Sequence, residues 1–162
     1  FGRRYGVVPT AVRVLYARAP FVAFLSLVIM IGRLKALRVS QELASLIQVS
    51  VALRNGCTFC ADLHMAEVLR EQLGVARFRA LLEFETSDAF TPREKAALRY
   101  VAALHESLHI PDQVWDALRT HFDERECVDI VWLCAIERYY NALALPLRIG
   151  TDQLAGRAHA GS

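Results

Sequence analysis

The sequence has few lysines and no cluster of like charge. Its only lysines are Lys35 and Lys95, and its arginines are scattered along the 162 residues. Lysine and arginine together number 19, against 17 aspartates and glutamates, which gives a formal net charge of +2. Nucleic-acid-binding proteins concentrate positive charge on one face or in one segment. The charge pattern therefore indicates no nucleic-acid partner.

A hydrophobic run long enough to cross a membrane is also missing. The most apolar segment, "PFVAFLSLVIMIGR" at 20–33, is shorter than the roughly 18–20 apolar residues that span a bilayer. It has no basic segment before an A-x-A-like cleavage site, so it does not resemble a signal peptide. We expect a buried or interface helix there and no membrane partner. Four cysteines without an export signal favour the cytoplasm, where paired cysteines tend to be catalytic or metal-binding.

Hydrophobic residues are nevertheless abundant. They make up 54% of the chain, and the mean hydropathy is +0.26. A single domain of this size cannot hide that much apolar surface by itself. We therefore expect a homo-oligomer whose interface covers the excess.

The chain also lacks the strict alternation of apolar and polar residues that marks a strand, and it has no low-complexity linker. The pattern predicts a single all-α domain over 1–150, a helical bundle, followed by a C-terminal tail over 151–162 whose end, "AGRAHAGS", is frayed. The expected helices span about 10–18, 21–34, 41–53, 57–72, 75–84, 92–107, 111–120 and 124–145.

Several of these boundaries carry capping signals. Ser40 is a favourable N-cap, and the Asn-Gly pair at 55–56 is a strong helix stop. "TPRE" at 91–94 and "DERE" at 123–126 have the spacing of capping boxes. Pro146 ends the last of the expected helices.

The stretch "RNGCTFCADLHMAEVL" at 54–69 brings three reactive residues together. The helix stop places Cys57 in the first turn of a new helix and Cys60 one turn in, where helix amides and the helix dipole favour a thiolate. His64 lies on the same face as Cys60 and is able to take the thiol proton or to stabilise the thiolate as an imidazolium. Cys57 is placed to resolve a sulfenic acid on Cys60 as a disulfide. The spacing predicts a dithiol redox centre.

Two other interpretations of this stretch remain open. Its two cysteines and its histidine are possible zinc ligands, although structural zinc sites use four ligands, usually from two separate knuckles. Cys127 and Cys134 are seven residues apart in an apolar stretch and form no second knuckle, so we expect them in the core. The second interpretation is that the cysteines of the stretch are likewise buried and structural.

Other polar and aromatic residues give weaker signals. His105 and His109 lie four apart on one helix face, which suits a metal, but no carboxylate or cysteine partner is evident and surface histidines are the simpler interpretation. Trp115 and Trp132 are expected in the core. No cofactor is predicted.

With these residues identified, the chain resembles a known family. "NGCTFCADLH" is similar to the C-x-x-C-x-x-x-H motif of the alkyl hydroperoxidase D-like branch of the carboxymuconolactone decarboxylase family, and the segments at 90–105 and 114–150 resemble its later helices. The resemblance implies an all-α fold that assembles as dimers, trimers or hexamers. It implies peroxide reduction or dithiol–disulfide exchange, in which Cys60 attacks peroxide, Cys57 resolves and His64 shuttles protons.

The acidic part of the family pattern is different here. Thiol peroxidase members usually carry a glutamate twelve residues before the first cysteine, and this chain has Ser45 there. Glu42, one turn earlier, is a candidate to replace that glutamate by reaching down the helix; the alternative is an acid that complements the helix dipole. Glu67, three residues after His64, is a candidate to orient the imidazole, or else part of a solvated face.

The leading hypothesis is thus a thiol-dependent oxidoreductase that reduces a hydroperoxide through a Cys60 sulfenate resolved by Cys57. Its expected partners are a hydroperoxide or small disulfide substrate and a dithiol reductant or protein electron donor. One alternative is a dithiol–disulfide adaptor or redox sensor without efficient peroxidase turnover, which Ser45 favours. The other is a non-catalytic oligomeric binding protein on the same fold, which the apolar surplus favours.

Overall fold

A computed structural model describes residues 6–160, without the side chains of 30–36 and 159–160. This range is helical and contains no β-strand, so the predicted all-α fold is confirmed. The helices, in chain order, are the π-helix η1 (Val12–Tyr16) and the α-helices α2 (Pro20–Ala36), α3 (Gln41–Arg54), α4 (Thr58–Arg70), α5 (Val75–Arg79), α6 (Pro92–Glu106), α7 (Asp112–His121), α8 (Glu124–Ala144) and α9 (Leu154–Ala160).

The predicted N-terminal caps form. Ser40 Oγ accepts the backbone N–H one turn further on, at 3.2 Å, and opens α3. Thr91 and Glu94 form a capping box at the start of α6, and Asp123 and Glu126 form another at the start of α8. Each box satisfies two amides that the first turn of a helix leaves without partners. Local sequence therefore sets where these helices begin.

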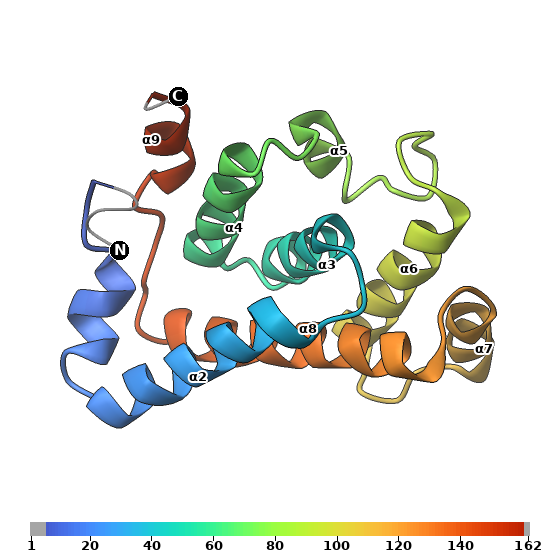
Figure 1. Cartoon of the computed structure of the whole chain (residues 1–162), viewed down its shortest axis with the longest axis horizontal. Coiled ribbons are helices and arrows are strands. Elements are labelled where there is room, and N and C mark those ends of the chain that lie inside the picture. The colour runs from blue at the N-terminus through green and yellow to red at the C-terminus, as the bar shows by residue number, and fades with distance from the viewer. Residues whose placement is uncertain (1–5, 161–162) are drawn as a thin grey trace.

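Helix α3 lies in the middle of the bundle (Figure 1) and packs against α4, α6 and α8. Its residues 43–52 are all buried. The long helix α8 runs along one side of α3, while η1 and α2 lie at the N-terminal end of the chain and meet α8 where Tyr140 Oη donates to the Ser26 carbonyl at 3.3 Å. Helix α8 thus packs against both α3 and α4, near the turn that joins them.

We predicted one helix over 75–84, and this prediction is wrong. Helix α5 ends at Arg79, and turns continue to residue 86. Hydrogen bonds run from each third amide to the carbonyl three residues earlier, from the Arg77 amide to the Thr86 amide. Phe78, Leu81 and Phe84 are buried in one cluster, and their three-residue spacing suits turns of three residues better than the 3.6-residue α-helix.

The frayed tail that we predicted is also wrong, as far as the described residues extend. Residues 154–160 form α9, which packs against α4. Asp62 of α4 accepts hydrogen bonds from the backbone N–H groups of Leu154 and Ala155, both at 2.9 Å, and from Thr151 Oγ1 at 2.7 Å. A carboxylate supplied by another helix therefore satisfies the first amides of α9. Residues 161–162 lie outside the described range.

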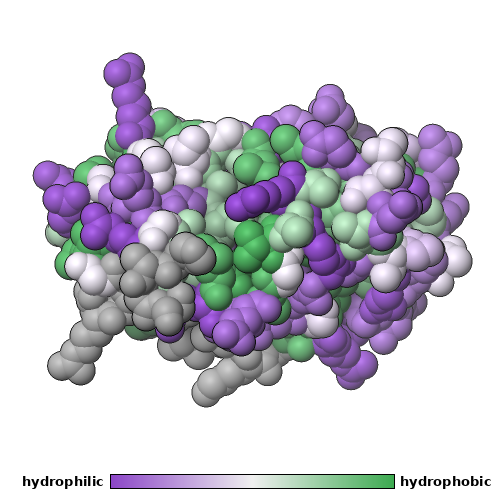
Figure 2. Space-filling view, turned by 90° about the horizontal axis from the view of Figure 1, so that it is seen from above, coloured by the Kyte–Doolittle hydropathy of each residue, from purple (hydrophilic) through white to green (hydrophobic). Residues whose placement is uncertain are grey.

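Exposed hydrophobic side chains gather on two helices. Phe21, 73% exposed, and Phe24 lie on α2. Trp132, which we predicted in the core, is 43% exposed on α8 beside Val128 and Val131. The face drawn in Figure 2 is mixed instead, with hydrophilic residues spread across its width. Among residues 6–160, no helix is both long enough and apolar enough to cross a membrane.

Candidate active site

The two cysteines of the motif lie at the junction of α3 and α4. Gly56, at a φ of 70°, ends α3 in the left-handed region that favours glycine. Cys57 is the N-cap of α4, and its Sγ accepts the amide N–H of Cys60 at 3.3 Å. The two sulfurs are joined in a disulfide, as the spacing predicted, and the side chains are only 1% and 2% exposed. The site is therefore a buried disulfide at a helix N-terminus.

His64 lies one turn after Cys60 and is held by two carboxylates. Its Nε2 is 2.7 Å from Glu137 Oε2 of α8, and its Nδ1 is 3.7 Å from Glu67 Oε2 of its own helix. Burial by itself lowers the pKa of this histidine, but the charge of Glu137, its hydrogen bond and the contact with Glu67 outweigh burial and raise the pKa to about 9. At neutral pH the ring is therefore an imidazolium.

Glu137 is the principal residue that the sequence analysis missed. It is fully buried, and both of its oxygens are engaged: Oε2 with His64, and Oε1 with Asn141 Nδ2 at 2.8 Å. A signal was available, because Ile130, Cys134, Glu137 and Asn141 recur at helical spacing on the buried face of α8. A carboxylate on such a face requires a buried partner.

A chain of side-chain hydrogen bonds continues from this glutamate to the turn before the cysteines. Asn141 Oδ1 accepts from Asn55 Nδ2 at 2.7 Å, and Asn55 Oδ1 is 3.1 Å from Nδ1 of the exposed His105. Asn55 directly precedes the Gly56 turn. The turn that places the disulfide and the carboxylate that charges His64 are therefore fixed to each other.

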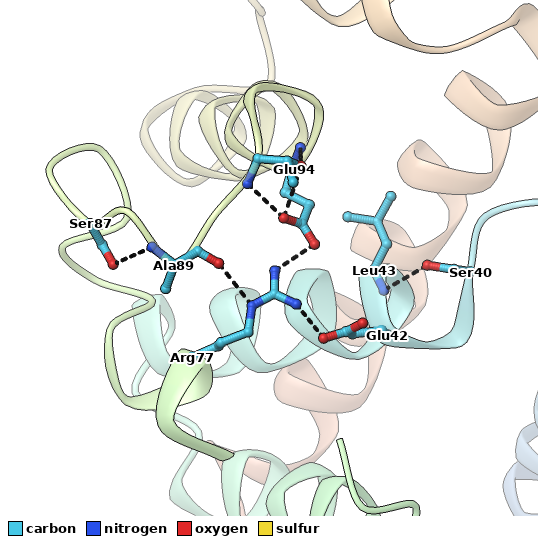
Figure 3. Close-up of polar contacts among 8 residues, drawn as sticks. Ser40, Glu42, Leu43, Arg77, Ser87, Ala89 and Glu94 are labelled. Atoms are coloured by element: carbon cyan, nitrogen blue, oxygen red, sulfur yellow. Dashed lines mark hydrogen bonds and ion pairs between the residues drawn. The ribbon is translucent and has the colours of Figure 1, made fainter. Parts of the chain in front are cut away.

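The structure does not bring Glu42 to the cysteines. Glu42 forms an ion pair with Arg77 of α5, which also donates to Glu94 Oε1 at 2.6 Å and to the Ala89 carbonyl at 2.9 Å (Figure 3). This pairing and the position of Glu42 in the first turn of α3 agree with the alternative that it complements the helix dipole. The carboxylate beside His64 comes from α8 instead, as Glu137.

A cavity of about 450 Å³ opens beside the disulfide. Its walls come from η1, α2, α3, α4, α8 and the segment after α8, and most of the lining side chains are apolar. A few polar or reactive side chains lie among them: Tyr16, Ser26, Gln48, Cys60, His64, Glu67, Glu137 and Tyr140. Burial raises the pKa of Tyr140 to about 12, so its hydroxyl stays protonated. A volume of this size suits a small organic ligand.

The remaining cysteines are buried in the core, as predicted. Burial raises the pKa of the Cys134 thiol to about 12 and also raises that of Cys127. Such thiols carry almost no thiolate at neutral pH and are poor nucleophiles. Among the described side chains, no group of three or more histidines, cysteines and acids has the arrangement of a metal site.

Comparisons with known proteins find a family match over part of the chain. Residues 34–103, which include the whole cysteine motif, match the carboxymuconolactone decarboxylase family. The resemblance seen in the motif is therefore confirmed over this part of the chain. The match ends before α8, so Glu137 lies outside it.

Individual relatives support the same fold. Protein YdfG of Bacillus subtilis is 28% identical over 111 residues, which are 67% of this chain and 76% of YdfG. A protein of unknown function from Agrobacterium tumefaciens, for which antioxidant defence under the name AhpD has been suggested, is 25% identical with a TM-score of 0.79, over 86% of this chain and 97% of its own. The debrominase Bmp8 has a TM-score of 0.85 at 19% identity, over 97% of this chain and 84% of its own. The family match and the Agrobacterium tumefaciens protein indicate a redox or antioxidant role, whereas Bmp8 supports the fold alone.

Proposed function

We propose that this protein is a thiol-dependent peroxidase that reduces hydroperoxides with the Cys57–Cys60 pair. The observation that carries the proposal is the position of Cys60, which borders a mostly apolar cavity together with the His64–Glu137 ion pair. A thiolate, a positive charge to stabilise it and space for a small organic molecule are the three requirements of the reaction.

The reaction begins with the dithiol form. The Cys60 thiolate attacks the terminal oxygen of R–O–O–H, so that an S–O bond forms while the O–O bond breaks. The alkoxide that leaves takes a proton and becomes R–OH. The Cys57 thiolate then attacks the Cys60 sulfur, the S–S bond forms and the S–O bond breaks, and the hydroxide released takes a proton to become water. The two thiols lose two electrons and two protons to the peroxide in total.

His64 has two tasks in this sequence. As an imidazolium one turn from Cys60, it stabilises the thiolate by its charge. It then donates its proton to the leaving alkoxide as a general acid. Glu137 keeps the ring charged and oriented, and Glu67 assists from the other nitrogen. Glu137 thus takes the role of the family glutamate, whose position is occupied by Ser45 in this chain.

The disulfide must be returned to the dithiol by a reductant. Both sulfurs are buried, and Cys60 borders the cavity. A slender dithiol that enters the cavity therefore suits the site better than a protein that presents a disulfide-reducing centre on a flat surface. We place the reaction in the cytoplasm, where dithiol reductants are maintained.

We also propose that the protein forms a homo-oligomer. The interface is expected to bury the exposed apolar side chains of α2 and α8, among them Phe21, Phe24 and Trp132. The oligomer is a dimer, trimer or hexamer, as the family resemblance implies. Sedimentation equilibrium of the wild-type protein distinguishes these from a monomer.

A disulfide adaptor or redox sensor is the second candidate function. The burial of both sulfurs favours it, because restricted access slows turnover while leaving a stable disulfide. Such a protein exchanges rapidly with one dithiol or disulfide partner and consumes peroxide slowly. The third candidate is a non-catalytic binding protein that uses the cavity, and its thiols are expected to stay unreacted.

The deciding experiment follows both cysteines by mass. The reduced protein is mixed with a small excess of tert-butyl hydroperoxide, quenched at intervals and analysed intact and as peptides. We expect rapid loss of two hydrogens at Cys57–Cys60 and none in Cys60→Ser. Cys134→Ser is the matched control, since that thiol is buried in the core, and it is expected to react as the wild type does. Full peroxide consumption by Cys60→Ser would falsify the proposal.

A further inference from the structure

Gln48 carries a buried oxygen without a hydrogen-bond partner. The residue lies in the middle of α3 and is 1% exposed, and its side-chain Oε1 has no donor within hydrogen-bond distance among the described residues. Leaving a buried acceptor unsatisfied is unfavourable, and native proteins rarely do so without a reason. A ligand that donates a hydrogen bond would satisfy it.

The position of Gln48 identifies where that ligand binds. Gln48 borders the same cavity as Cys60 and His64, whereas Ser45, one turn earlier on α3, is absent from the lining. The carboxylate of Glu137, which also borders the cavity, has both oxygens engaged. Ser26 Oγ also borders the cavity without a hydrogen-bond partner among the described residues, but a hydroxyl donates as well as accepts, whereas Gln48 Oε1 can only accept. Gln48 Oε1 is therefore the acceptor that a donor on a substrate would satisfy.

We propose that Gln48 accepts a hydrogen bond from the O–H group of the substrate hydroperoxide and selects substrates that carry one. This inference rests on the proposed peroxidase function. In R–O–O–H the hydrogen is on the terminal oxygen, which is the atom that the Cys60 thiolate attacks. A hydrogen bond to Gln48 therefore holds the electrophilic oxygen by its own hydrogen and leaves the alkoxide side toward the remaining cavity.

The same contact discriminates against substrates without a donor. A small disulfide such as 2,2′-dithiodipyridine has neither O–H nor N–H, so it gains nothing from the Gln48 oxygen. Its reaction with the dithiol gives the Cys57–Cys60 disulfide and two molecules of pyridine-2-thione, so it oxidises the same sulfurs. The two oxidants separate the effect of Gln48 on the hydroperoxide from any effect on the thiols.

The test compares two rate constants in Gln48→Met, a change that keeps the length of the side chain and removes the acceptor. The reduced protein is mixed with tert-butyl hydroperoxide or with 2,2′-dithiodipyridine, and the loss of thiols is followed under single-turnover conditions. Loss of one hydrogen bond predicts a rate with the hydroperoxide about tenfold lower. The rate with the disulfide is expected to stay within about twofold of wild type. Gln113→Met, at an exposed position of α7 outside the cavity lining, is the matched control and should change neither rate.

Each outcome decides the matter. Equal falls with both oxidants would mean that Gln48 only supports the structure, and no fall with either would mean that it binds no substrate; both overturn the inference. Should Gln48→Met not fold, Gln48→Leu takes its place with the same two oxidants. A wild-type protein that reacts with the disulfide but not with the hydroperoxide overturns the proposed function, and the role of Gln48 with it. A wild type that reacts with both, beside a variant that keeps both rates, overturns the role of Gln48 alone.

Discussion

His64 and Arg77 are both cations held between two carboxylates, and they differ in what surrounds them. His64 lies between Glu137 and Glu67, is buried and borders the cavity beside the disulfide. Arg77 lies between Glu42 and Glu94, is partly exposed and joins α5 to α3 and α6 (Figure 3). The two centres share a pattern of charge, but only His64 lies one helical turn from Cys60 and lines the same cavity.

The two cations differ in whether they can release a proton, and this difference decides whether such a centre can act as an acid. Arginine keeps its proton at any physiological pH, and its carboxylates raise its pKa further despite the opposing effect of burial. Histidine releases its proton within reach of ordinary pH, and in His64 that point is moved to about 9. A cation that can release its proton beside a nucleophile is suited to catalysis. A cation that keeps its proton, such as Arg77, connects helices.

The largest effect is expected from removing the charge of Glu137. In Glu137→Gln only Glu67 still opposes the effect of burial, so the His64 pKa should fall well below its value of about 9. The thiolate then loses the positive charge that stabilises it and the leaving alkoxide loses its proton donor, so we expect the rate with hydroperoxide to drop about 100-fold or more. NMR titration of the His64 ring and single-turnover kinetics measure the two effects. An unchanged rate with a lowered pKa would separate the ion pair from the chemistry.

The stability of the protein should depend on pH through the same pair. The His64 pKa is about 9 in the folded protein, against 6.5 for an unperturbed histidine. Because the folded state binds the proton more tightly, this stabilisation is complete below the unfolded pKa and is lost as the pH rises through the folded one. We expect the free energy of unfolding to fall by up to about 1.4 kcal/mol per pH unit in that window.

Denaturant titration of the oxidised protein at several pH values measures this slope. His64→Gln removes the titrating ring and is expected to flatten it. A slope of the same size in that variant would assign the pH dependence to other groups.

Removing Arg77 should affect stability and leave the chemistry intact. Arg77→Met keeps much of the contact with Phe90, whose ring centroid lies 5.5 Å from the guanidinium carbon, and removes all three polar contacts. For a partly exposed cluster we expect about 1–2 kcal/mol lower free energy of unfolding. Chemical denaturation measures it. The rate with hydroperoxide should stay within about twofold of wild type, and a larger fall would join the two centres functionally.

The smallest effect is expected from Glu42→Gln. Arg77 keeps Glu94 and the Ala89 carbonyl, so the loss of one exposed charge should lower the free energy of unfolding by only about 0.5 kcal/mol. The rate of Cys60 oxidation is expected to be that of the wild type. A clear loss of rate would restore the hypothesis that Glu42 replaces the family glutamate.

What the sequence predicted was local. The caps at Ser40, Thr91 and Asp123, and the Cys57–Cys60 pair at a helix start, depend on residues within one turn of each other, so their spacing alone indicates the structure. His64 belongs to the same local group.

What the sequence did not predict was contributed by distant residues. Glu137 reaches His64 across 73 residues, and Asp62 caps α9 across more than 90. No spacing rule connects such pairs, because which face of α8 meets α4 is decided by packing. Gln48 was missed for another reason. In the sequence it is one of several polar residues in a largely apolar helix, and its unpaired oxygen becomes apparent only when the packing of the whole protein is known.

Helix η1 forms one wall of the cavity, and residues distant in sequence hold it in place. The backbone N–H of Thr10 donates to Asp152 at 2.7 Å, across 142 residues of sequence, and the Thr10 hydroxyl donates to the same carboxylate at 2.6 Å. A ribosome delivers Asp152 long after Cys57 and Cys60, and contacts between distant residues form late in folding. The growing chain therefore cannot complete the enclosure around its two thiols before residue 152 has been synthesised.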